Sequence, residues 1–146
     1  VAVDPESRRN LLFVKQAYMR LAQSLQNRGQ NDSAVAVLDK CLEFFPNDKI
    51  PYDMYMLAYP EIYYKAGEMK KGDDLIDAII ANCMDNLRYY GELDNRFIPY
   101  YSESIRENLA MINEMSNIAA RNGRLELKQR LENLLDQEFS KFMHVF

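Results

Sequence analysis

Several residue types are scarce or absent in this chain of 146 residues, and each shortage narrows what the protein can be. There are two cysteines and one histidine, His144 near the end, which are too few ligands for a structural zinc site. We therefore predict no metal ion and no cofactor. Tryptophan is absent, which weighs against a carbohydrate-binding platform. No apolar run approaches the ~20 residues that span a bilayer, so we expect no direct insertion of this segment into a membrane.

Basic residues are also in short supply. The chain has 18 lysines and arginines against 22 acidic residues, a formal net charge of −4. Because a protein that grips phosphate backbones usually carries a basic face, we predict no nucleic-acid partner. Hydrophobic residues make up 48% and charged residues 27%, which is typical of a folded globular protein, and the length fits one domain over residues 1–146. The chain begins at Val1 without a methionine or a signal peptide, so we interpret it as a piece of a longer protein.

An internal repeat dominates the first ninety residues. Four residue pairs keep the same offset of 38 positions, and in each copy an amphipathic stretch leads into a glycine turn that a second amphipathic stretch follows. The sequence therefore predicts an αα-hairpin that occurs twice in the same register. The pairs are Gly29 with Gly67, Leu25 with Tyr63, Ala34 with Gly72, and Leu38 with Ile76.

The first copy resembles the tetratricopeptide repeat. Its order is an aromatic residue, a Leu-Ala pair, an apolar residue, a turn glycine, small residues and a closing proline. Small residues at Ala22, Ala34 and Cys41 would let two helices cross closely. The resemblance implies stacked hairpins in a right-handed superhelix. The positions that carry it are Tyr18, Leu21, Ala22, Leu25, Gly29, Ala34, Leu38, Cys41 and Pro46.

The rest of the chain departs from this pattern. Pro60 stands inside the first helix of the second copy, where it should kink or shorten that helix. A third hairpin has helical periodicity but lacks the small residues, and we interpret it as a capping unit that Ser104 and Glu107 open as a capping box. Its expected inner positions are Ile105, Leu109, Ile112 and Ile118 or Ala119 in the first helix, and Leu127, Leu131, Leu134, Leu135 and Phe139 in the second. The overall expectation is an all-α array of about three hairpins and six helices. The hairpins are expected near residues 7–46, 51–90 and 100–144.

Helix ends and thiols give further local predictions. Gly29 is suited to a left-handed helix cap, and Asn31 or Asp32 is expected to cap the helix that follows. Cys41 and Cys83 both fall on apolar stripes, so we favour buried thiols over a disulfide.

In tetratricopeptide arrays the first helix of each hairpin lines a concave groove. Met19 stands where a carboxylate clamp would need a lysine, so we favour an extended peptide segment over a C-terminal carboxylate. The residues that the register places on this groove are Gln16, Met19, Gln23, Gln26, Met54, Leu57, Glu61 and Tyr64.

Catalytic motifs were sought, and the sequence holds no glycine-rich phosphate loop, nucleophile elbow or metal-binding spacing. We therefore predict that the chain is not an enzyme. Asp73, Asp74 and Asp77 could form a cation site, but acidic residues that favour a helix start are the preferred interpretation. Nine of the ten tyrosines lie between Tyr52 and Tyr101, several of them in adjacent pairs. One ring of a pair could grip a peptide or a sugar, although core filling is favoured.

Five segments of the chain have a distinctive sequence, and they are residues 20–22, 39–43, 45–52, 62–68 and 87–90. Together they resemble the soluble C-terminal tail of a bacterial family of multi-pass membrane proteins of unknown function, over roughly residues 15–140. The membrane part of that family resembles lipid-sugar-dependent protein O-mannosyltransferases. The resemblance implies a domain on the extracytoplasmic (periplasmic) face of the inner membrane, tethered through a preceding part, with any glycosyl transfer belonging to that part.

These observations predict a non-catalytic interaction or scaffolding module whose partner is a protein or peptide. Two alternatives stay open. The chain could be a purely structural accessory domain of a membrane glycosyltransferase-like protein, or it could present carbohydrate or acceptor proteins.

Overall fold

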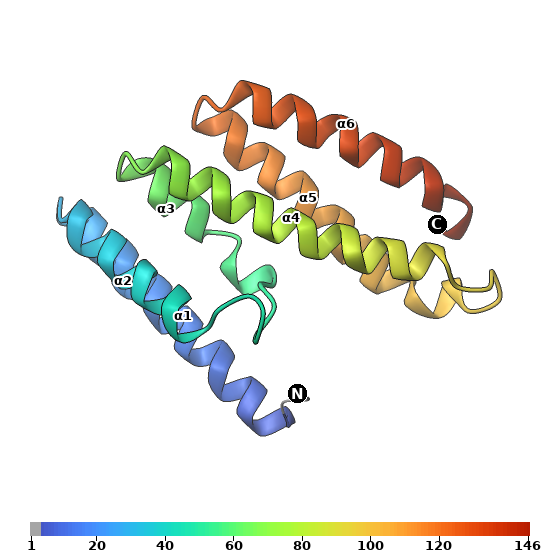
Figure 1. Ribbon diagram of the computed structural model, residues 1–146, viewed down its shortest axis with the longest axis horizontal. Coiled ribbons are helices and arrows are strands. Elements are labelled where there is room, and N and C mark those ends of the chain that lie inside the picture. The colour runs from blue at the N-terminus through green and yellow to red at the C-terminus, as the bar shows by residue number, and fades with distance from the viewer. Residues whose placement is uncertain (1–3) are drawn as a thin grey trace. The chain divides into compact units, whose positions relative to one another are not determined.

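A computed structural model describes residues 4–146, and within these residues the chain is entirely helical, without a strand. The all-α prediction with six α-helices is therefore confirmed. Short 3₁₀ turns η1 (Met54–Met56), η2 (Ile98–Tyr101) and η3 (Met143–Val145) join or end the longer helices (Figure 1). The six helices are α1 (Pro5–Asn27), α2 (Asn31–Phe44), α3 (Tyr59–Lys65), α4 (Met69–Gly91), α5 (Ser102–Arg121) and α6 (Leu125–Phe142).

The chain divides into two compact units. The first unit ends at Leu75 and the second begins at Ile76, so the division falls inside α4. No helix within residues 4–146 combines the length and the apolar character needed to cross a membrane.

Three glycine turns share one backbone geometry. Gly29, Gly67 and Gly123 have φ angles of 76°, 85° and 72°, a region that side-chain-bearing residues rarely adopt. In each turn the amide after the glycine donates to the carbonyl five residues earlier, and the next helix begins two residues after the glycine. This is the Schellman cap. Its distances are 2.9 Å for Gln30 to Leu25, 2.9 Å for Glu68 to Tyr63 and 2.8 Å for Arg124 to Ala119.

Helices α1 and α2 pack antiparallel in the first unit, and the N-terminal half of α1 runs past the end of α2 (Figure 1). Ala22, Ala34 and Cys41 are all fully buried, as expected of residues where helices cross. Leu21 is different, because half of its surface is exposed where the sequence pattern predicted a core position. It precedes Ala22 by one residue, and a step of about 100° around the helix turns it to the other side.

Helix starts differ from the sequence predictions. Asp4 caps α1, because its Oδ1 accepts from the amides of Glu6 and Ser7 at 3.1 and 3.0 Å. The predicted cap of α2 by Asn31 or Asp32 is wrong, since the cap residue is Gln30 and it makes no side-chain cap bond. The helix starts directly behind the glycine turn and leaves no extended residue to serve as a cap.

The predicted capping box of Ser104 with Glu107 is also wrong. The turn η2 leads directly into α5, which begins at Ser102, so Ser104 already lies inside the helix. Pro60 behaves as predicted and shortens its helix: it stands in the first turn of α3, where no amide donor is needed, and α3 has only 7 residues.

Helices α5 and α6 form the antiparallel hairpin of the second unit (Figure 1). The predicted inner face of α5 is buried, as are Leu127 and Leu131 of α6. Phe139, also predicted to be inside, is 47% exposed, while its neighbour Glu138 is only 4% exposed. The buried line of α6 runs from Leu131 through Glu138 to Phe142 at helical spacing, which leaves Phe139 on the outer side.

Candidate functional site

The predicted groove residues of the first unit do not all reach solvent. Gln23 and Met54 are exposed, and five further residues are half-buried. Gln26 is occupied within the unit, because its Nε2 donates to the carbonyl of Ile62 at 2.9 Å. The five half-buried residues are Gln16, Met19, Gln26, Leu57 and Glu61.

Tyr64 departs furthest from its predicted place on an open surface, because only 3% of it is exposed. Its hydroxyl donates to Oδ1 of Asp73 at 2.6 Å, and its ring lies in the space beside Gly72. Tyr63, the other member of the pair, is buried as well. Both rings of this pair therefore fill the core, which is the interpretation that the sequence analysis favoured, and the missing side chain of Gly72 makes room for the second ring.

A polar cluster lies in the core of the first unit. The hydroxyl of Tyr59 donates to the carbonyl of Lys15 at 2.6 Å, and Sγ of Cys41 lies 3.5 Å from the same hydroxyl. All three residues are buried. Burial raises the pKa of the Cys41 thiol and of the Tyr59 hydroxyl, so both stay protonated at neutral pH.

Lys15 was not singled out by the sequence, yet its side chain is only 1% exposed. Its Nζ lies 3.9 Å from Oδ2 of Asp53, too far for a hydrogen bond. Among the side chains that the structure describes, this ammonium is buried without a hydrogen-bond partner. The sequence did contain one sign that Lys15 is buried. It stands seven residues before Ala22, and this spacing places both residues on the same side of α1.

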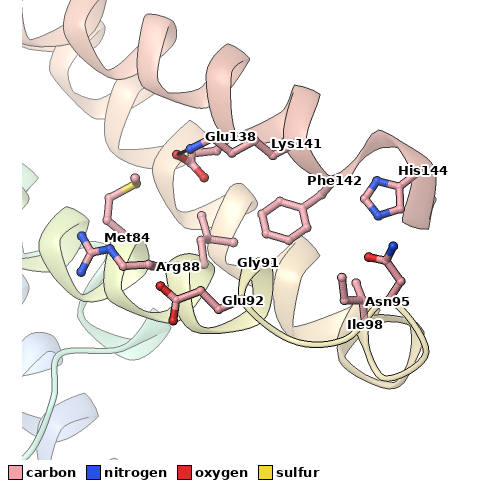
Figure 2. A pocket seen from close by; sticks show the side chains of 11 residues that line it. Met84, Arg88, Gly91, Glu92, Asn95, Ile98, Glu138, Lys141, Phe142 and His144 are labelled. Atoms are coloured by element: carbon pink, nitrogen blue, oxygen red, sulfur yellow. Dashed lines mark hydrogen bonds and ion pairs between the residues drawn. The ribbon is translucent and has the colours of Figure 1, made fainter.

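A hollow of about 470 Å³ lies in the second unit, where α4 and α6 end (Figure 2). Leu87, Ile98 and Phe142 are buried and form its apolar base. More polar side chains surround this base, and Figure 2 shows the ring of Phe142 near their centre. These surrounding residues are Arg88, Glu92, Asn95, Glu138, Lys141 and His144.

The charges of this hollow are largely engaged by their own neighbours. Nζ of Lys141 lies 2.8 Å from Oε1 of Glu138, and Nη1 of Arg88 lies 3.3 Å from Oδ1 of Asp85. Both cations stand in the last turn of a helix, where they also offset the negative end of the helix dipole. The hollow can receive a small group that has an apolar part, but Arg88, Glu138 and Lys141 are already paired with neighbouring residues.

Exposed tyrosines also gather in the second unit. Tyr90 stacks on Tyr101 with ring centroids 5.2 Å apart, and Tyr89 contacts Tyr90 edge-on at 5.6 Å. Tyr89 is exposed while Tyr90 is half-buried, so in this adjacent pair one ring reaches solvent, which is the alternative to core filling that the sequence left open.

The three carboxylates considered for a cation site are engaged separately. Asp73 accepts from Tyr64, Asp74 pairs with Lys70 at 2.6 Å, and Asp77 pairs with Arg130 at 2.6 Å. Within residues 4–146, no group of three histidine, cysteine or acidic side chains is arranged to hold a metal ion.

An apolar stripe lies on the outer side of α1. We call it the outer stripe and define it as Phe13, Val14, Ala17 and Leu21. All four residues are exposed, Phe13 to 63%. Because a helix turns by about 100° per residue, Ala17 lies on the side opposite to the buried Lys15. One side of α1 thus packs in the core, and the other presents apolar side chains.

Comparison of the chain with protein-family models, with curated proteins and with solved structures gave no match.

Proposed function

We propose that the chain is a non-catalytic protein-interaction or scaffolding module, built of tetratricopeptide-like hairpins that stack in a right-handed superhelix. The repeated glycine cap supports this interpretation, because Gly29, Gly67 and Gly123 close three helical pairs with the same backbone bonds. The buried small residues Ala22 and Ala34 support it too, since they stand where the tetratricopeptide pattern needs close helix approach.

The outer stripe of α1 is the observation that carries the interaction role. Phe13 and Leu21 expose 63% and 50% of their surface on the same side of one helix. Single exposed apolar residues are common, but a contiguous apolar surface on a helix marks a place where another molecule binds. The predicted groove residues Gln23 and Met54 offer additional exposed contacts in the same unit.

The resemblance to the tail of a membrane-protein family extends the proposal. In that setting the module would stand on the extracytoplasmic face of the inner membrane and be held there by a preceding membrane part. It would bind a protein or peptide partner, and it would carry no glycosyl transfer of its own.

A carbohydrate- or acceptor-presenting role is the second candidate, and one observation favours it. Tyr89 and Tyr100 are exposed, 56% and 83%, beside the stacked rings of Tyr90 and Tyr101. Flat ring faces with hydroxyl groups are suited to sugar rings as well as to peptides. Titration with mannose oligosaccharides, followed by tyrosine fluorescence, separates this role from the first.

A photo-crosslinking amino acid at position 13 tests the interaction role in the source cells. We expect ultraviolet light to join the protein to a second polypeptide at this position. The matched control carries the same group in place of Ala36, an exposed residue on α2. The proposal fails if position 13 captures no more protein than position 36 does. The same group at Gln23 reports separately on the predicted groove.

A further inference from the structure

The cations of α1 differ from those of the other helices in their partners. Every lysine and arginine of α2 to α6 forms an ion pair, apart from Arg106, which lies over the ring of Phe146 at 4.9 Å. In contrast, no ion pair among residues 4–146 involves Arg9, Arg20 or Arg28. Among residues 4–146, the arginines without an ion pair, apart from Arg106, therefore lie on α1 and at its C-cap, Arg28, while Lys49 after α2 is a lysine without one.

The sequence of this helix offers few partners. Glu6 in the first turn is the one acidic residue of α1, and no aspartate or glutamate occurs from Ser7 to Asn31, although the whole chain has a net charge of −4. The positive charge also lies beside the outer stripe. At about 100° per residue, Arg9 and Arg20 follow the same edge of the stripe, and Arg28 stands at its C-terminal end.

The outer stripe is narrow and has the spacing of a helix-packing seam. Val14, Ala17 and Leu21 follow one another at intervals of three and four residues, the spacing by which one helix packs along another. The small side chain of Ala17 at the centre allows a second helix to approach closely. Phe13 widens the seam on the side where the arginines lie.

On the basis of the proposed interaction function, we infer that the outer stripe of α1 binds an acidic amphipathic helix from another polypeptide. The apolar seam of that helix would cover Val14, Ala17 and Leu21, and its flanking carboxylates would face Arg9 and Arg20. Charged groups that flank an apolar seam select the partner and its orientation.

Two other occupants fit the surface less well. A second copy of this chain would bring its own arginines and no carboxylate between Ser7 and Asn31, so like charges would meet. A membrane-surface helix needs a broad apolar face that enters the lipid. The rest of the apolar surface of α1 is not available to lipid, because the side opposite the stripe is packed against α2, η1 and α3. Only the narrow outer stripe is left, which is not a broad face.

Three synthetic peptides of three heptads test the inference, with leucine at the seam and glutamate, glutamine or lysine at the flanking positions. We expect the glutamate peptide to bind at least about tenfold more tightly than the glutamine peptide, and to weaken as salt is added. The double variant Arg9→Glu with Arg20→Glu should reverse the preference and bind the lysine peptide. The control Lys49→Glu makes the same kind of charge change outside α1 and should leave the preference unaltered.

Each contrary outcome overturns the inference. These outcomes are equal binding of the three peptides, no binding of the glutamate peptide at millimolar concentration, and self-association that Leu21→Glu abolishes. Binding to phosphatidylserine vesicles with the same dependence on Arg9 and Arg20 also overturns it. The photo-crosslinking test at position 13 tells the two proposals apart. If the crosslinker still captures another protein in any of these cases, the inference of an acidic helical partner is wrong and the interaction function stands. If it captures none, the proposed function itself fails.

Discussion

The ring of Tyr64 occupies the space that a side chain at Gly72 would need. A Cβ at Gly72 would lie 2.5 Å from Cε1 of Tyr64, well inside any real contact distance. The Tyr64 hydroxyl also donates to Asp73, the next residue of the same helix, at 2.6 Å. Gly72, which matches a small position of the repeat, and Tyr64, which was predicted to face a groove, are thus in direct contact with each other.

Gly72→Ala should destabilise the protein, although alanine normally favours a helix over glycine by about 1 kcal/mol. The added methyl group must displace the Tyr64 ring, and overpacking of this kind costs about 1–3 kcal/mol. Gly91→Ala is the matched control, because its Cβ would meet Cζ of Phe142 at an ordinary 3.7 Å. Urea unfolding measures both variants. Equal stability of the two would contradict the contact.

Lys15→Met should leave the stability unchanged or raise it by about 1–3 kcal/mol, the cost of a buried polar group that has no hydrogen-bond partner. The reason is that the Lys15 ammonium is buried, lacks a hydrogen bond and lies 3.9 Å from Asp53. Lys15→Ala is the control, since it removes the charge but leaves a cavity. Thermal unfolding followed by circular dichroism compares the two variants with the unchanged protein. A loss of stability in both Lys15→Met and Lys15→Ala would mean that the charge is needed.

Tyr59→Phe should cost about 0.5–1.5 kcal/mol, because it removes a fully buried 2.6 Å hydrogen bond to the carbonyl of Lys15, which lies inside α1. Tyr63→Phe is the comparison. It removes a 2.7 Å bond to Asp39, which is half-buried and keeps a 2.7 Å bond from Lys71. We therefore expect the second loss to be the smaller one in urea unfolding. A larger loss of stability in Tyr63→Phe than in Tyr59→Phe would contradict this expectation.

Stability should fall as the pH rises above about 9. Burial raises the pKa of Cys83 to about 12, while an unfolded thiol ionises near pH 8.5–9, so alkali favours the unfolded chain. This thiol alone should lower the free energy of unfolding by about 1–2 kcal/mol at pH 10. Cys41, Tyr59 and Tyr63 have pKa values shifted in the same direction.

Urea unfolding between pH 8 and 10 checks this, with Cys83→Ala as the variant that should show the shallower decline. An identical decline in both proteins would show that Cys83 does not contribute. Iodoacetamide should also modify neither Cys41 nor Cys83 in the folded protein at pH 8, because both thiols are buried.

The sequence predicted the helical fold well, because its strongest signals are local. Glycine at positions 29, 67 and 123 fixes the turns through backbone conformation alone, and Pro60 fixes the start of α3 through its missing amide. Each of these glycines, and likewise Pro60, determines the backbone conformation of the residues next to it in the sequence. The sequence pattern alone is therefore enough to predict where these helices begin and end.

The surfaces were harder to predict, because they depend on contacts between distant residues. Tyr64 is buried through the absence of a side chain at Gly72, and Lys15 through packing with Tyr59, which lies 44 residues further along the chain. Leu21 matches a core position of the repeat pattern, yet it is half exposed. Phe139 was expected on the inner side of α6, yet it is exposed and the preceding residue Glu138 is buried, since helical periodicity alone leaves the buried line uncertain by one residue.

The identical cap in all three turns has a consequence for how such a chain can evolve. Every helical pair is closed by its own short turn, while the connections between pairs, with their 3₁₀ segments η1 and η2, are longer and unlike one another. Recombination within a connection could therefore add or delete a whole pair without altering any closing turn. For the same reason, a peptide tag placed in a connection is less disruptive than one placed at a glycine.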